Sequence, residues 1–331
     1  MRRIAASCAL VGLVGLAAVT VSGCSSSSPA RSSGDGRLRV ATTVAPITDI
    51  VRQVVGDRVH VVGLIPEGVD SHTFEPSPST VKTLSHTDVL FLDGLHLEGT
   101  TMKQARANMP RGSTIVPLGD RVLAPADYAF DFTFPQSRGD PNPHLWMDPA
   151  YVRRWSELVR DTMAERDPAN ASYYRENQAR FAAVVGQLDR AIATAIASIP
   201  DTKRKLLTYH DSFAYFARHY GMAVIGAVQP SDFSEPSAKE VSALVDQVRT
   251  TGVPAVFGSE VFPSRVLAQV ARQSGARYVD KLRDDELPGP SSSAGHTYVG
   301  LMVDDVVTIT AALGGDPSLL RAVPTARTWQ P

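Results

Sequence analysis

Three histidines have the residue type and the placement to bind a metal together. His72, His144 and His210 each follow a predicted β-strand in the sequence. In open α/β sheets, ligands bind beyond the carboxyl ends of the strands, so side chains that follow different strands can point into one cleft. Imidazole is the commonest metal ligand in proteins. Because the three histidines are far apart along the chain, such a site must be assembled by the tertiary fold.

A fourth ligand is expected from the loop that follows the last predicted strand. Zinc accepts neutral imidazole readily and prefers four ligands. Asp284, Asp285 and Glu286 lie in this loop, and each is an alternative on these grounds. One carboxylate with three imidazoles would leave bound Zn2+ with a single net positive charge and a closed coordination sphere. A closed sphere suits transport rather than catalysis, which needs an open position.

The other histidines lie in different surroundings. His96, in "DGLHLEG", also follows a strand and is a rival ligand. His296 begins the last predicted helix and is ambiguous. His60 lies inside a strand, and His86 and His219 lie at helix ends, where a cation interacts favourably with the helix dipole. We expect these last three to be structural or solvated.

The N-terminal segment predicts export and a lipid anchor. Arg2 and Arg3 precede a short apolar run that ends in "VSGC", a pattern typical of a secretory signal peptide over residues 1–23. The motif resembles a bacterial lipobox, whose Cys24 would be acylated and become the new N-terminus. Residues 24–37 are rich in Ser and Gly and predict a flexible tether. We therefore expect the protein on the extracytoplasmic face of the cell membrane, in the periplasm or at the cell surface.

The composition excludes several classes of protein and of site. The chain has 331 residues and a formal net charge of −1, which gives no electrostatic basis for binding nucleic acid. Its two cysteines, Cys8 and Cys24, lie in the segment that is predicted to be removed or lipidated. The folded part would then have no disulfide, no cysteine nucleophile and no cysteine metal ligand. We expect a monomer.

Predicted strands alternate with amphipathic helical segments in both halves of the chain. Alternation of this kind favours parallel sheets with helices on both faces. One helical segment opens with a predicted capping box formed by Ser237 and Glu240. The strands are expected at 38–43, 58–64, 88–94, 113–118, 204–209, 222–228, 253–258 and 277–282.

A long segment without strand character separates the two halves. Residues 167–200 begin with Asp-Pro and end at a proline, so they predict one continuous linking helix. We assign the chain to the α/β class, with two lobes that each hold a mostly parallel four-stranded sheet flanked by helices and are joined by this long backbone helix. The N-terminal lobe is expected at 38–166 and the C-terminal lobe at 201–331. A stiff link of this kind limits hinge closure between the lobes.

The segments around the three histidines resemble those of a known family. "DSHTFEPSPSTVKTL", "NPHLWMDP" and "LLTYHDSFAYFARHYG" are similar to the three ligand loops of the bacterial solute-binding lipoproteins that deliver zinc or manganese to ABC importers. Residues 235–271 are similar to the body of the family's C-terminal lobe, and the likeness covers nearly all of the chain after the signal peptide. The family's plan, two lobes bridged by a long helix, matches the plan predicted from the residues.

The resemblance implies a function and a set of ligands. The fourth family ligand is an acid of the C-terminal loop, for which we choose Asp285 before Asp284, with His296 left open. Histidine at the third ligand position is usual in the zinc carriers, and glutamate is usual in the manganese carriers. The implied function is capture of Zn2+ between the lobes and its delivery to a cognate ABC permease, without enzymatic activity. The residues at the first three ligand positions are His72, His144 and His210.

The sequence departs from the family pattern in two places. Many zinc carriers have a long His-rich insertion after the fourth strand, whereas residues 119–143 contain no histidine. This protein therefore works without such an insertion or receives its metal from a donor protein. Asp93 occupies a position where the family commonly has asparagine, and the sequence offers no explanation for it.

Other functions and other supporting residues stay open on the sequence alone. The alternatives to zinc delivery are delivery of Mn2+, a metal-linked surface adhesin and a zinc hydrolase. A zinc hydrolase needs a general base and a substrate pocket, and the sequence has no local signature of either. A carboxylate commonly orients a metal-binding imidazole. We expect Glu240, Glu260 or Asp211 to have that role.

Overall fold

The computed structural model describes residues 35–229, 234–259 and 264–330. The predicted signal peptide, Cys24, Glu260 and most of the predicted tether lie outside the described residues. Within the described ranges, no helix has the length and the apolar character that crossing a membrane requires.

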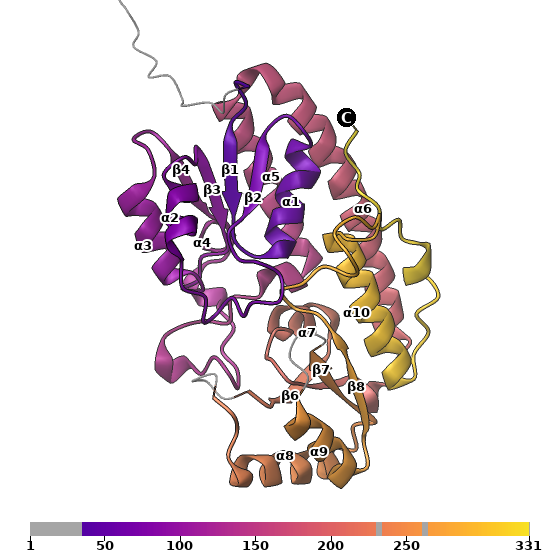
Figure 1. Cartoon of the computed structure of the whole chain (residues 1–331). Helices are drawn as coiled ribbons and strands as arrows, with labels where there is room; N and C mark the ends of the chain where they lie inside the picture. Colours follow the sequence, from indigo (N-terminus) through magenta and orange to yellow (C-terminus); the bar gives the residue numbers. More distant parts are fainter. Residues whose placement is uncertain (1–34, 230–233, 260–263, 331) are drawn as a thin grey trace, which may run out of the picture.

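Two parallel sheets form the centres of two lobes, as Figure 1 shows. The first sheet has the strand order β2-β1-β3-β4 and the second has the equivalent order β6-β5-β7-β8. Each of the eight strands in the described part of the chain overlaps a predicted range, which confirms these strand predictions and the fold class. The strands are β1 Arg39–Thr42, β2 His60–Gly63, β3 Val89–Leu92, β4 Thr114–Pro117, β5 Lys205–Thr208, β6 Ala223–Ala227, β7 Ala255–Ser259 and β8 Arg277–Leu282.

Helices flank both sheets, and short polar side chains fix where several of them begin. Asp148 accepts a hydrogen bond from the Ala150 amide at the start of α5, and the predicted capping box of Ser237 and Glu240 opens α8. Such caps satisfy backbone N–H groups that the helix itself leaves without a partner. The α-helices are α1 Ala45–Val55, α2 Pro78–Leu84, α3 Gly99–Asn108, α4 Leu118–Val122, α5 Pro149–Arg166, α6 Ala171–Ala197, α7 Ala214–Tyr220, α8 Ala238–Thr251, α9 Arg265–Ser274 and α10 Tyr298–Leu313.

The long linking helix is present but starts later than predicted. Residues Pro168–Asn170 form a 3-10 turn, and α6 then spans 27 residues. At ~1.5 Å per residue, α6 is about 40 Å long. Figure 1 shows it running beside both lobes, next to α10. The short turn exists because Asp167 leaves helical backbone geometry, with φ −137° and ψ 71°, between α5 and α6.

One continuous apolar core joins the lobes to the long helix. Trp155 of α5, Phe181 of α6, Phe216 of α7 and Met302 of α10 are fully buried in the same cluster. Burial of large apolar side chains is the main favourable term in folding. Large hinge rotations would have to open this cluster, so we expect the movements that accompany metal release to be confined to loops.

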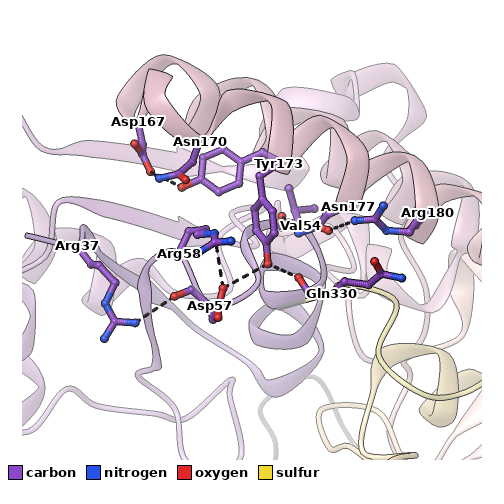
Figure 2. Close-up of polar contacts among 11 residues, drawn as sticks. Arg37, Val54, Asp57, Arg58, Asp167, Asn170, Tyr173, Asn177, Arg180 and Gln330 are labelled. Atoms are coloured by element: carbon purple, nitrogen blue, oxygen red, sulfur yellow. Dashed lines mark hydrogen bonds and ion pairs between the residues drawn. The ribbon is translucent and has the colours of Figure 1, made fainter.

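The end of the chain returns to the N-terminal lobe. Figure 2 shows Tyr173 of α6 donating a hydrogen bond to the carbonyl of Gln330 at 2.7 Å, beside Asn177, which donates to the Val54 carbonyl at 3.1 Å. The Thr328 amide also donates to Gln53 of α1 at 2.8 Å. The last residues of the predicted C-terminal lobe thus contact the N-terminal lobe, and the lobe boundaries at 166 and 200 stay a prediction.

Candidate metal centre

The three predicted histidine ligands meet at one point between the lobes. Their Nε2 atoms are 3.2 Å apart for His72 and His144, 3.1 Å for His72 and His210, and 2.9 Å for His144 and His210. His72 comes from the loop after β2, His144 from the segment before α5, and His210 directly follows β5. The strand-end rule therefore brought together side chains from both sheets.

These separations fit a metal ion with tetrahedral coordination. With Zn–N bonds of about 2.0–2.1 Å, two tetrahedral ligands lie roughly 3.3 Å apart. The observed Nε2 distances of 2.9–3.2 Å are close to that value. Among the described residues, these histidines form a group of ligand atoms that all lie within 4.8 Å of one another.

Two of the imidazoles are held by side-chain amides. The Nδ1 atom of His144 lies 2.8 Å from Asn142 Oδ1, and the Nδ1 atom of His210 lies 2.6 Å from Gln229 Oε1. An amide oxygen only accepts hydrogen bonds, so each Nδ1 carries the proton. The Nε2 lone pairs of His144 and His210 then face the metal position.

The orientation of the Asn142 amide is determined by its other contacts. Its Nδ2 group donates to Asp131 Oδ2 at 2.7 Å and to the Asp211 carbonyl at 2.5 Å. Both partners are acceptors, so the nitrogen must face them and the oxygen must face His144. The Asp211 carbonyl belongs to the residue after His210, so Asn142 connects two ligands that come from different lobes.

Amides, rather than the carboxylates that we expected, orient His144 and His210, and the expected Glu260 lies outside the described residues. Asp211 accepts hydrogen bonds from the backbone amides of Phe132 and Thr133 at 3.1 and 3.3 Å, rather than from an imidazole. Glu240 closes the capping box of α8. The sequence signal for Asn142 was its place two residues before His144, where a short side chain can reach the backbone amide and the ring of a near neighbour.

The surroundings of two of the predicted ligands favour the neutral imidazole. Burial, together with the neighbouring His210, holds the pKa of His72 and His144 well below the ordinary value for histidine. Removing a cation from water disfavours the charged form of an imidazole. Neutral imidazole is the form that binds metal, so the site is in its binding form before the ion arrives.

Aromatic side chains form the walls around the histidines. Trp146 is fully buried, and its ring lies edge-on to the His144 ring at 5.0 Å between centroids. Its indole Nε1 donates to the Asp284 carbonyl at 2.7 Å, which ties the segment of His144 to the acidic loop. Phe134 lies 5.4 Å from the His72 ring. These rings pack against His72 and His144 and restrict how the two imidazoles can turn.

The acidic loop lies beside the histidine group without joining it. Ser71, the residue before His72, donates a hydrogen bond to Asp285 Oδ2 at 2.5 Å. The other carboxylate oxygen, Oδ1, is buried and has no hydrogen-bond partner among the described residues. Burial and the neighbouring Asp284 raise the pKa of Asp285 well above its ordinary value. Asp285 as the fourth ligand therefore stays a prediction.

The remaining histidine alternatives lie away from the centre. His296 contacts Glu67 at 3.1 Å and the Gly289 carbonyl at 3.1 Å. His96 is exposed and contacts Asp140 at 2.5 Å. His60 contacts Asp35 at 2.9 Å, and the structure places neither His86 nor His219 in the group of metal-binding atoms.

Three converging imidazoles between two lobes with parallel sheets define a metal-binding protein of the two-lobe solute-binding class. A family model described as the periplasmic component A of the zinc-uptake complex matches residues 40–312. The match covers most of the chain, which belongs to this family. Its members are solute-binding components of ABC transporters rather than enzymes, which confirms that part of the prediction.

The names of similar proteins refer to different metals. The manganese-binding lipoprotein MntA of Halalkalibacterium halodurans is 25% identical over 297 residues, which are 89% of this chain and 95% of the relative. The zinc-binding protein TroA of Treponema pallidum is 29% identical over 287 residues, 84% and 90% of the two chains. The solved structure of TroA has the same fold, with a TM-score of 0.75 at 24% identity over 84% of this chain and 99% of that chain.

Proposed function

We propose that this protein captures Zn2+ outside the cytoplasmic membrane and delivers it to a cognate ABC permease. The observation that carries the proposal is the convergence of three histidine Nε2 atoms within 3.2 Å of one another. In this proposal the protein works as a monomer, is anchored to the membrane by a lipid on Cys24 and receives its metal directly or from a donor protein. Relatives named as lipoproteins support the anchor.

The ligand set favours zinc over manganese. Imidazole suits zinc, whereas carboxylate, carbonyl and water oxygens suit manganese. The third ligand is His210, and its Nδ1 group already donates to an amide oxygen, which leaves a nitrogen rather than an oxygen facing the metal. Relatives named for zinc and for manganese both occur, so the chemistry of these ligands is what supports the choice.

The fourth ligand in this proposal is Asp285. Its carboxylate is buried beside the residue that precedes His72, and one oxygen has no hydrogen-bond partner among the described residues. A buried carboxylate oxygen without a hydrogen-bond partner is costly unless a cation or a donor compensates it. Arrival of Zn2+ would draw this oxygen toward the three imidazoles by a shift of the loop after β8.

A competition titration of the demetallated protein tests the proposal. We expect one Zn2+ per chain, not displaced by excess Mn2+, for the wild type. His144→Ala should remove a ligand that the rest of the site holds rigidly and should abolish tight binding while the circular dichroism spectrum is unchanged. Equal affinity for the two ions would contradict the zinc preference, and wild-type affinity in His144→Ala would contradict the site itself.

A further inference from the structure

A cavity connects the metal centre to the surface on one side. It has a volume of about 180 Å3, and His72 is part of its wall. His144 and His210 are buried, with 0% and 8% of their surface exposed, whereas His72 is partly exposed. An ion that approaches from solvent therefore meets His72 first. Two further side chains with metal-binding chemistry line this cavity, His96 and Asp140.

His96 and Asp140 form a pair with the arrangement of a metal ligand and its support. The His96 Nδ1 atom lies 2.5 Å from Asp140 Oδ1, and both side chains are largely exposed, at 68% and 57%. Histidines that bind metal commonly donate their second ring N–H to a carboxylate, which fixes the tautomer and raises the basicity of the other nitrogen. The pairing with Asp140 leaves the His96 Nε2 lone pair available.

The backbone holds His96 at the cavity in an unusual conformation. Leu95 and His96 have φ angles of 47° and 70°, and they are the described non-glycine residues with positive φ. The turn is held by the Leu95 amide, which donates to Asp120 at 3.1 Å, and by the Leu97 amide, which donates to the Gly94 carbonyl at 2.9 Å. Unfavourable backbone geometry of this kind persists only where the surrounding structure enforces it, and it concentrates at functional sites.

We propose that His96 and Asp140 form a transit site, at which an incoming Zn2+ ion binds briefly before it passes through the cavity to His72. The inference rests on the proposed function, because it concerns the path to the same metal centre. Imidazole and carboxylate are both zinc ligands. Arg138 also lines the cavity and adds a positive charge. Weak binding is therefore expected at this site, which suits transfer rather than storage.

The test compares the rate of zinc binding in single variants by stopped-flow mixing of the demetallated full chain with Zn2+. His96→Asn removes the imidazole, and asparagine tolerates positive φ better than most residues, so the turn should persist. We expect the second-order rate constant to fall on the order of tenfold, the lower end of the gain that local concentration of an ion gives. Asp140→Asn should slow binding less, and the zinc affinity at equilibrium should be unchanged in both variants.

The matched control is His86→Asn, because His86 is an exposed histidine outside this cavity and contacts the Lys82 carbonyl at 2.9 Å. Its rate should equal that of the wild type. A wild-type rate in His96→Asn would overturn the transit site and leave the proposed function standing. A loss of equilibrium affinity in His96→Asn would also overturn it, since His96 would then belong to the final site. Absence of tight zinc binding in the wild type would instead overturn the proposed function.

Discussion

The candidate metal centre, taken with Asp285 as its proposed fourth ligand, has two halves that are built differently. His144 and His210 are buried and each donates to a side-chain amide, and Asn142 links them across the lobes. His72 and Asp285 are also linked across the lobes, through Ser71, but they lie on irregular loops over residues 64–77 and 283–297. We call His144 and His210 the rigid half and His72 and Asp285 the movable half. Affinity can thus come from the rigid half, while release needs only a movement of the movable half.

The two irregular loops are joined at more than one place. The Gly68 amide donates to the Glu286 side chain, and His296 contacts Glu67 at 3.1 Å. Both contacts join residues before Ser71 in the first loop to residues after Asp285 in the second. Because several hydrogen bonds join the two segments, we expect them to move as one unit when the ion is released. The continuous apolar core behind them would stay in place.

Among the variants that compare the two halves, the largest expected effect comes from removing the Asp285 carboxylate. Asp285→Asn keeps the shape of the side chain but replaces an anionic ligand by a neutral amide. We expect zinc affinity to fall by at least about 100-fold, the upper end of what the loss of a supporting residue costs. Isothermal competition titration with a chelator measures the change.

Asp284→Asn is the matched control for that measurement. Asp284 is the neighbouring buried acid, and its carbonyl accepts from Trp146 through the backbone, which the substitution leaves intact. We expect a much smaller loss of affinity. A larger loss of zinc affinity in Asp284→Asn than in Asp285→Asn would assign the fourth ligand to Asp284.

A smaller loss of zinc affinity is expected when the Gln229 side chain, which holds the His210 ring, is replaced. Gln229→Leu removes the acceptor for His210 Nδ1 and should lower zinc affinity by about 10–100-fold. Gln229→Glu retains an acceptor at the same place and should bind zinc at least as well as the wild type. The Thr133 hydroxyl donates to the Gln229 backbone carbonyl, so the local chain path is kept in both variants. Equal losses of zinc affinity in Gln229→Leu and Gln229→Glu would show that the Gln229 side chain only fills space and does not hold the His210 ring through a hydrogen bond.

The sequence predicted the ligands of the rigid half better than their supports. His210 directly follows β5, and His144 lies in the long segment between β4 and α5, so both were found from the strand order. Asn142 and Gln229 were missed because their role depends on how the loops fold against each other across the lobes. We expected the carboxylates of Asp211 and Glu240 to hold the imidazoles. Both carboxylates instead accept hydrogen bonds from backbone amides.

The same rule does not separate His96 from His72, His144 and His210, the histidines that converge. His96 also follows a strand, but the positive φ angles of Leu95 and His96 turn the chain so that the ring lies at the cavity wall beside Asp140. Backbone conformation at two successive residues is not visible in residue types. Likewise, the choice of Asp285 before Asp284 rested on the resemblance and stays a prediction, because adjacent acids in an irregular loop have no regular alternation that would show which one faces the cleft.

The smallest effect concerns stability of the demetallated protein as pH falls. The pKa values of His72 and His144 are lowered in the folded state, so between about pH 6.5 and those lower values the unfolded chain binds protons that the folded chain does not. Stability from these groups is complete above about pH 6.5 and decreases below it, by at most ~1.4 kcal/mol per pH unit for each histidine. Buried acids act in the opposite direction, since burial raises the pKa of Asp49 to about 6 and that of Glu286 to about 7.

The histidine contribution is therefore isolated as a difference between two proteins. Thermal unfolding of the demetallated wild type and of His144→Leu should be compared from pH 7.5 to pH 5.5, a range chosen around the ordinary histidine pKa of ~6.5. The wild type should lose more stability over this range, because it retains one more imidazole that must stay neutral when folded. In proteins of about 150–250 residues, 1 kcal/mol corresponds to a shift of about 2–4 °C in Tm, and the shift is smaller in a longer chain such as this one. Parallel curves would mean that His144 is free to take up a proton in the folded protein, and the rigid half would then not be set for metal in advance.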